Sequence, residues 1–187
     1  MIMLKNRTSR LATFCVTVFI CAATPAWAQR TPHRDMSAIG GDVGLFLPRQ
    51  DGMTTGPALE GFLEHYLSAR DSIRVNVGWA NPKVDREQSD SMRQIRIGAD
   101  LVHNWEGGAI HPFAGAGLGA YFLQARDNGR SVGDRRTRLG GNLLGGVEFF
   151  TSNRFSVKGE GRYHIVSKAD GYDPSGLALS IGIKGYF

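Results

Sequence analysis

The last eleven residues of the sequence read Leu177-Ala178-Leu179-Ser180-Ile181-Gly182-Ile183-Lys184-Gly185-Tyr186-Phe187. Side chains alternate between the two faces of a β-strand, so every large aliphatic side chain of this segment falls on one face. Small or polar side chains, such as those of Ser180 and Lys184, fall on the other face. A strand needs ~9–11 residues to cross the hydrocarbon layer of a bilayer. The segment therefore has the length and the pattern of a transmembrane β-strand.

The same alternation recurs in seven earlier segments, which gives eight predicted strands, an even number as in single-chain bacterial barrels. The seven segments are Ile39–Leu47, Leu59–Leu67, Ile73–Trp79, Gln94–Leu101, Phe113–Phe122, Leu139–Phe149 and Phe155–Ile165. We predict an all-β fold, an eight-stranded antiparallel up-and-down transmembrane β-barrel.

The connections between these segments alternate in length. The longer ones are Pro48–Gly56, Asn81–Ser91, Ala125–Thr137 and Ser167–Gly176, and the shorter ones are Ser68–Ser72, Trp105–Ala109 and Thr151–Arg154. Outer-membrane barrels have short periplasmic turns and longer extracellular loops. With both termini in the periplasm, all four longer connections would lie outside the cell.

Ionisable side chains gather on the polar face of the predicted strands. They are Asp42, Glu60, Glu64, Arg74, Arg96, Asp100, Glu148, Lys158, Glu160, Arg162 and Lys184. The interior of an eight-stranded barrel is only wide enough to be filled by side chains. Charges buried there are tolerated when they are paired. We predict an ion-paired, filled lumen without an open water channel.

The N-terminal segment has the pattern of a secretory signal peptide. A basic start is followed by the apolar run Leu11–Ala23 and by the small-x-small pattern Ala26-Trp27-Ala28. The alternative is a membrane-anchoring helix, but that would need ~20 apolar residues. We predict that residues 1–28 are removed and that residues 29–187 form the barrel domain.

The composition argues against several other classes of function. The whole chain has 22 basic and 17 acidic residues, and without the predicted signal peptide 19 basic residues face 17 acidic ones. This small excess gives no reason to expect nucleic-acid binding. Both cysteines, Cys15 and Cys21, lie in the signal segment, and the histidines lack metal-ligand spacing. We expect neither a disulfide nor a metal.

Gly115, Gly117 and Gly119 alternate within one predicted strand. A dinucleotide-binding loop would need an opening helix after the strand and a different glycine spacing. The glycines more simply make room on the crowded inner face. No cofactor is expected.

Four motifs carry a family resemblance. They are His111–Gly119, Gly141–Phe150, Gly159–His164 and the terminal Gly185-Tyr186-Phe187. With them the chain resembles the small outer-membrane β-barrel domain family, which includes eight-stranded OmpA- and OmpX-like barrels. The resemblance implies a place in the bacterial outer membrane with periplasmic termini. It also implies insertion by the barrel-assembly machinery, with Phe187 as the C-terminal signal, and a monomer in contact with lipid and lipopolysaccharide.

The function is less determined than the fold. The leading hypothesis is a non-enzymatic surface protein that acts in envelope integrity or adhesion through its four outer loops. A narrow diffusion channel and a lipid A-modifying acyl hydrolase are alternatives. A periplasmic lipocalin-like barrel would have a polar outer face, which this pattern does not predict.

The hydrolase alternative depends on Glu160, His164 and Ser167. Acyl hydrolysis needs a hydroxyl nucleophile, an imidazole base and a carboxylate that orients the base. Some outer-membrane lipid A deacylases carry these groups in a His-x-Ser-Asn pattern, whereas here Ile165 and Val166 separate His164 from Ser167. Glu160 and His164 should also face the lumen instead of the lipid. We therefore expect no enzymatic activity.

One loop is rich in arginine. The segment Ala125–Thr137 contains Arg126, Arg130, Arg135 and Arg136, which are offset in part by two aspartates. Arginine binds phosphate in a bidentate manner. These arginines are therefore candidates for contact with lipopolysaccharide headgroups, and the alternative is a solvated, mobile loop.

Overall fold

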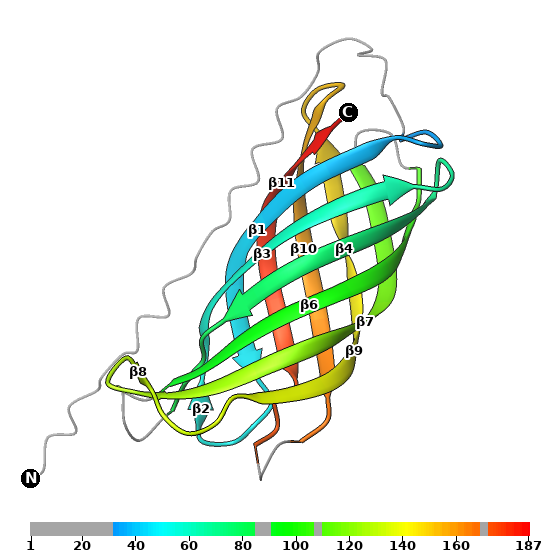
Figure 1. Ribbon diagram of the computed structural model, residues 1–187. Coiled ribbons are helices and arrows are strands. Elements are labelled where there is room, and N and C mark those ends of the chain that lie inside the picture. Colours follow the sequence, from blue (N-terminus) through cyan, green and yellow to red (C-terminus); the bar gives the residue numbers. More distant parts are fainter. Residues whose placement is uncertain (1–31, 85–90, 107–109, 169–171) are drawn as a thin grey trace, which may run out of the picture.

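The computed structural model describes residues 32–84, 91–106, 110–168 and 172–187, and within them the chain folds into a closed antiparallel β-barrel (Figure 1). The eight long strands of this described part are β1 (Ser37–Pro48), β3 (Gly56–Tyr66), β4 (Asp71–Ala80), β6 (Ser91–Asn104), β7 (Ile110–Asp127), β9 (Arg136–Phe150), β10 (Phe155–Val166) and β11 (Gly176–Tyr186). Two-residue strands lie in the connections: β2 (Met53–Thr54), β5 (Lys83–Val84) and β8 (Arg130–Ser131). The predicted signal peptide, residues 1–28, lies outside the described residues.

Pairing between the first and the last strand closes the barrel. Each long strand pairs with its neighbours in the sequence, and β11 pairs with β1 in a register that places Val43 opposite Ile181. Hydrocarbon offers no hydrogen-bond partners, so a spanning β-structure must satisfy every backbone group by closing on itself. The eight-stranded antiparallel barrel predicted from the sequence is confirmed.

The wall of the barrel is apolar outside and polar inside. Leu179, Ile181 and Ile183 are 48%, 67% and 65% exposed, whereas Lys184 on the same strand is fully buried. The alternation of side chains along each strand produces this sorting. No helix in the described part of the chain is long and apolar enough to cross a bilayer.

The two ends of the barrel differ in their connections. The turns 67–70 and 151–154 lie at the end that carries the C-terminus (Figure 1). The connections at the other end are longer and contain β2, β5 and β8. The alternation of long and short connections predicted from the sequence is therefore present.

The segment Ala125–Thr137, expected from the sequence to be a loop, contains a tight hairpin instead. β7 continues to Asp127, and Asn128-Gly129 turns the chain into β8 with φ angles of 46° and 77°. Two-residue turns with positive φ at both positions match the twist of paired strands, and Asn-Gly is the preferred pair for them. The arginine-rich segment is thus carried partly by a strand that extends the barrel wall.

Two glycines of the inner face lie directly opposite carboxylates. Gly182 pairs with Asp42 and Gly117 pairs with Asp100. A Cβ atom at either glycine would overlap a carboxylate oxygen of its partner, whereas a Cβ atom at the outward-facing Gly159 would meet nothing within 4 Å. The inner glycines therefore leave the space into which the acidic side chains extend.

The substitution Gly182→Ala should lower the free energy of unfolding by about 1–3 kcal/mol, because Asp42 would have to move within a filled interior. The matched change Gly159→Ala should stay within about 0.5 kcal/mol of the original protein. Urea unfolding in phospholipid vesicles, followed by tryptophan fluorescence, measures both values. Equal stabilities of the two variants would contradict this description of the packing.

Candidate functional site

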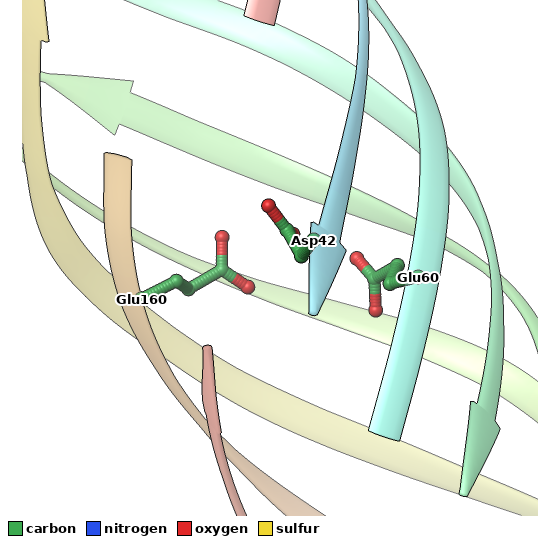
Figure 2. A group of neighbouring side chains, drawn as sticks. All are labelled: Asp42, Glu60 and Glu160. Atoms are coloured by element: carbon green, nitrogen blue, oxygen red, sulfur yellow. The ribbon is translucent and has the colours of Figure 1, made fainter. Parts of the chain in front are cut away.

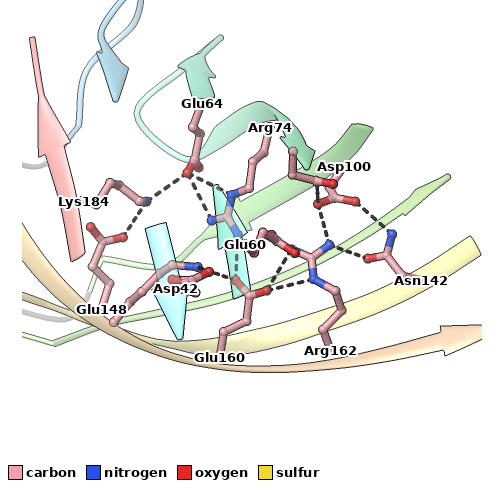
Figure 3. Close-up of polar contacts among 12 residues, drawn as sticks. Asp42, Glu60, Glu64, Arg74, Asp100, Asn142, Glu148, Glu160, Arg162 and Lys184 are labelled. Atoms are coloured by element: carbon pink, nitrogen blue, oxygen red, sulfur yellow. Dashed lines mark hydrogen bonds and ion pairs between the residues drawn. The ribbon is translucent and has the colours of Figure 1, made fainter. Parts of the chain in front are cut away.

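The structure places all eleven predicted lumen residues inside the barrel. Ten of them are at most 5% exposed, and the side chain of Glu60 is 14% exposed. They come from seven of the long strands, and β7 contributes glycines and aromatic rings in their place. The interior is thus an ion network built from nearly the whole barrel wall (Figure 3).

Lys184 organises the part of the network nearer the C-terminus. Its Nζ atom lies 3.0 Å from Glu64 Oε2 and 2.8 Å from Glu148 Oε2, and it donates a hydrogen bond to Tyr66 Oη at 3.1 Å. The hydroxyl of Tyr186 donates to Glu148. One cation on β11 therefore joins carboxylates of β3 and β9.

Glu160 is the centre of the network. Its carboxylate lies 2.7 Å from Arg74 Nη1, 2.8 Å from Lys158 Nζ and 2.8 Å from Arg162 Nη2. Lys158 Nζ also lies 2.8 Å from Asp42 Oδ2. Short contacts between opposite charges offset the cost of removing them from water.

Arg162 extends the network toward the loop end. Its guanidinium lies 2.7 Å from Asp100 Oδ2 and 3.0 Å from Glu60 Oε1, and it donates to Asn142 Oδ1 at 2.9 Å. Arg96 pairs with Glu60 at 2.5 Å. The sequence analysis did not single out Asn142, because an uncharged amide has only its position on the polar face to indicate this role.

Phe62 packs between two of the buried cations. The Arg74 guanidinium carbon lies 4.7 Å, and Lys158 Nζ lies 4.5 Å, from the centre of the Phe62 ring. The electron-rich face of an aromatic ring attracts cations. Phe62 therefore helps to hold the charges as well as filling space.

The space left inside this network is small. A cavity of about 50 Å³ lies beside Asp42, Trp79, Gln94 and Arg96. Asp42 Oδ1, Gln94 Oε1 and Arg96 Nη1 are buried polar atoms without a hydrogen-bond partner in the described chain. A cavity of this size accommodates a few water molecules, which is far less than a continuous pore requires.

Three carboxylates approach one another in this region (Figure 2). One carboxylate oxygen from each of Asp42, Glu60 and Glu160 lies within 4.8 Å of the others, an arrangement that could bind a hard cation. However, Lys158 and Arg162 already bridge these three acids. The cluster is therefore part of the ion-pair network.

The three residues of the hydrolase alternative lie in different surroundings. Glu160 is held by cations, and His164 Nδ1 lies 3.0 Å from Tyr121 Oη inside the lumen. Ser167 is exposed just beyond β10. Within the described residues, no hydrogen bond joins Glu160, His164 and Ser167 to one another.

The four arginines predicted to contact lipopolysaccharide divide into two groups. Arg130 is exposed on β8, Arg135 is exposed just before β9, and Arg136 is exposed as the first residue of β9. Arg126 is half-buried at the end of β7, where its Nη2 donates to the carbonyl of Gly129. Of the two groups, the first is exposed and the second is half-buried.

Phe187 continues the pairing of β11 with β1. Its N–H donates to the carbonyl of Ser37 at 2.9 Å, and the Ser37 N–H donates to the Phe187 carbonyl at 3.1 Å. The Phe187 side chain is 75% exposed. The residue predicted to be the C-terminal signal thus ends the closing strand pair.

The sequence matches the outer membrane protein beta-barrel domain over residues 13–187. The chain belongs to this family. It is therefore an outer-membrane protein, and the family resemblance drawn from the sequence is confirmed. No curated protein matches the sequence significantly.

Several solved structures of bacterial proteins have the same fold. Neisserial surface protein A has a TM-score of 0.66 and 15% identity, with 81% of this chain and 97% of that chain covered. OprG of Pseudomonas aeruginosa has a TM-score of 0.64 and 11% identity, with 85% and 99% covered. Ail of Yersinia pestis has a TM-score of 0.58 and 13% identity, with 82% and 99% covered. At these identities the similarity shows the shared fold alone.

Replacing Lys184 by Met should destabilise this outer-membrane barrel by about 3–5 kcal/mol, because Glu64 and Glu148 would remain buried with less positive charge nearby. Urea unfolding in vesicles measures the change. Adding Glu148→Gln to the Lys184→Met variant should recover part of the loss.

The exposed Lys83 provides the matched control, and Lys83→Met should leave the free energy of unfolding within about 0.5 kcal/mol of the original. Equal effects of the Lys184 and Lys83 substitutions would show that the buried ion pairs do not support the fold.

Proposed function

We propose that this protein is a non-enzymatic, monomeric envelope protein that acts through the loop end of a non-conducting barrel, in envelope integrity or adhesion. The main observation in support of this proposal is the filled lumen. Paired charges from seven strands occupy the interior, and the cavity beside them measures only about 50 Å³. The surfaces left for function are the lipid-facing wall and the two ends.

The proposed orientation places both termini in the periplasm and the longer connections outside the cell. The short turns and the C-terminus share one end of the barrel, and β2, β5 and β8 lie at the other (Figure 1). Short periplasmic turns and long extracellular loops are the general arrangement in such barrels. In this orientation the terminal Phe187 would be accessible to the barrel-assembly machinery from the periplasm.

The surroundings of His164 support the proposal that the protein is not an enzyme. A triad histidine must accept a proton from its nucleophile while a carboxylate orients it. Here His164 pairs with Tyr121, and Glu160 pairs with Arg74, Lys158 and Arg162. Ser167 lies outside the strand that carries both groups.

The partner that this geometry favours at the loop end is the phosphate of lipopolysaccharide. Arg130, Arg135 and Arg136 lie on the extension formed by β7, β8 and β9, where the proposed orientation brings them to the outer leaflet. Ail, a barrel of the same fold, has been crystallised with the sulfated heparin analogue sucrose octasulfate. This complex shows that a barrel of the same fold can bind a polyanion.

Reconstituted in planar bilayers, the protein should give no regular single-channel steps, because ions would have to displace the paired side chains of the lumen. A porin incorporated in the same way serves as the positive control. Reproducible unitary conductance from the purified protein would contradict the non-conducting barrel.

The triple substitution Arg130→Gln, Arg135→Gln and Arg136→Gln should weaken binding to lipopolysaccharide vesicles roughly tenfold, if each exposed charge contributes about 0.5 kcal/mol. Binding by the original protein should also weaken as salt concentration rises. Surface plasmon resonance on immobilised vesicles measures both effects.

A matched triple variant removes arginines from the opposite end: Arg34→Gln, Arg70→Gln and Arg154→Gln. It carries the same change in net charge, so its lipopolysaccharide affinity should remain near that of the original protein. Equal loss in the two variants would mean that net charge, and not the β7–β9 extension, governs binding.

A further inference from the structure

A second cavity lies at the loop end, apart from the lumen. It measures about 400 Å³ and is formed by the β1–β3 connection, β5, the start of β6, the end of β7 and Tyr172 before β11. None of its lining residues lines the small lumen cavity. Its volume falls in the range of sites that bind small molecules.

Two buried polar atoms belong to residues that line this cavity and have no hydrogen-bond partner among the described residues. They are Nε of Arg126 and Oη of Tyr172. The Arg126 guanidinium is fixed through its Nη2, which donates to the carbonyl of Gly129. Buried polar groups in folded proteins are nearly always paired, so an unpaired one requires an explanation. Two such atoms at one cavity, whose volume is far larger than that of the lumen cavity, favour a ligand as the missing partner.

The Tyr172 hydroxyl remains a hydrogen-bond donor at physiological pH. Burial, together with the neighbouring Asp173 carboxylate, raises the pKa of Tyr172 above its ordinary value. The N–H at Arg126 Nε can only donate. Arg126 Nε therefore requires an acceptor atom on the ligand, and the Tyr172 hydroxyl can donate to an acceptor of the same kind.

Hydrogen bonds between the connections fix the walls of the cavity. The N–H of Asp173 donates to Gln50 Oε1 at 2.5 Å, and the N–H of Arg49 donates to the Ser175 carbonyl at 2.9 Å. The N–H of Met92 donates to the Pro82 carbonyl at 3.0 Å. These contacts hold parts of the cavity walls in place, which reduces the entropy lost when a ligand binds.

The remaining lining determines the class of ligand. Met53, Val84 and Met92 present apolar surface, and methionine adapts to varied apolar shapes. Asp51 is exposed and also lines the cavity. Its negative charge disfavours a phosphate dianion more than a singly charged carboxylate.

We propose that this loop-end cavity binds a small amphipathic carboxylate. The carboxylate accepts hydrogen bonds from Arg126 and Tyr172, and the apolar body packs against Met53, Val84 and Met92. This site is independent of lipopolysaccharide binding by Arg130, Arg135 and Arg136, because none of these three arginines lines the cavity.

The test uses the full-length barrel in phosphatidylcholine nanodiscs and fluorine NMR of 4-fluorobenzoate, with empty nanodiscs to subtract partition into lipid. The original protein should bind this probe saturably and more tightly than neutral 4-fluorobenzyl alcohol or dianionic 4-fluorophenyl phosphate. Absence of saturable binding, or equal or tighter binding of either comparison probe, would overturn the proposal.

Two substitutions test whether the unpaired atoms of Tyr172 and Arg126 bind 4-fluorobenzoate. Tyr172→Phe removes only the hydroxyl and should weaken 4-fluorobenzoate binding roughly three- to tenfold, and Arg126→Gln should weaken it roughly tenfold or more because a charged donor is lost. The control Arg130→Gln, on the same hairpin but outside the cavity, should leave the affinity unchanged.

A shift in electrophoretic mobility on heating shows whether each variant is folded. If the folded Tyr172→Phe and Arg126→Gln variants bound 4-fluorobenzoate as tightly as the original protein, or if Arg130→Gln weakened binding equally, the assignment of this cavity would be wrong.

Discussion

The pairing of β11 with β1 is the contact on which the rest of the structure depends. An open sheet would expose unpaired N–H and C=O groups to hydrocarbon, where each one costs several kcal/mol. Closure removes both edges at once. It also separates two environments, because each strand then has one face toward lipid and one face toward a narrow interior. The exposed Ile181 and the buried Lys184 on one strand follow directly from that separation.

The narrow interior explains why the charges are so closely coupled. A small barrel leaves no room for bulk water between opposite walls, so an ionised group inside must find its counter-charge elsewhere on the wall, on its own strand or on another one. Glu160 meets cations from β4 and β10, and Lys184 meets carboxylates from β3 and β9. Glycines opposite Asp42 and Asp100 provide the space that these contacts need. At these two positions a carboxylate on one strand is matched by a glycine on its neighbour.

The strands and the set of lumen charges could be predicted from the sequence because both depend on a local period of two. For example, the alternation of apolar and polar residues around Leu179 and Lys184 predicts which face of the strand each side chain occupies. The partners within the lumen could not be predicted in the same way. That Arg162 meets Asn142 on β9 and Glu60 on β3 depends on strand register and barrel shear, which no local pattern contains. The Asn128-Gly129 turn did carry a local signal, but it lies between two alternating segments, and their spacing predicts a loop there. The loop-end cavity is even harder to predict from the sequence, because its lining residues come from connections that are distant in the sequence.

The long sequence separation of the lumen contacts has a consequence for how the chain acquires its structure. Lys158 and Asp42 are 116 residues apart, and Lys184 and Tyr66 are 118 apart. Neither contact can stabilise an intermediate that lacks one end of the chain. In a partly formed sheet these carboxylate and ammonium groups would therefore lack their partners. Such intermediates are poorly suited to the hydrocarbon layer. Folding should therefore be slow and strongly cooperative, as expected for contacts between residues distant in the sequence. The ion pairs would contribute to stability only late in folding, when the first and last strands pair.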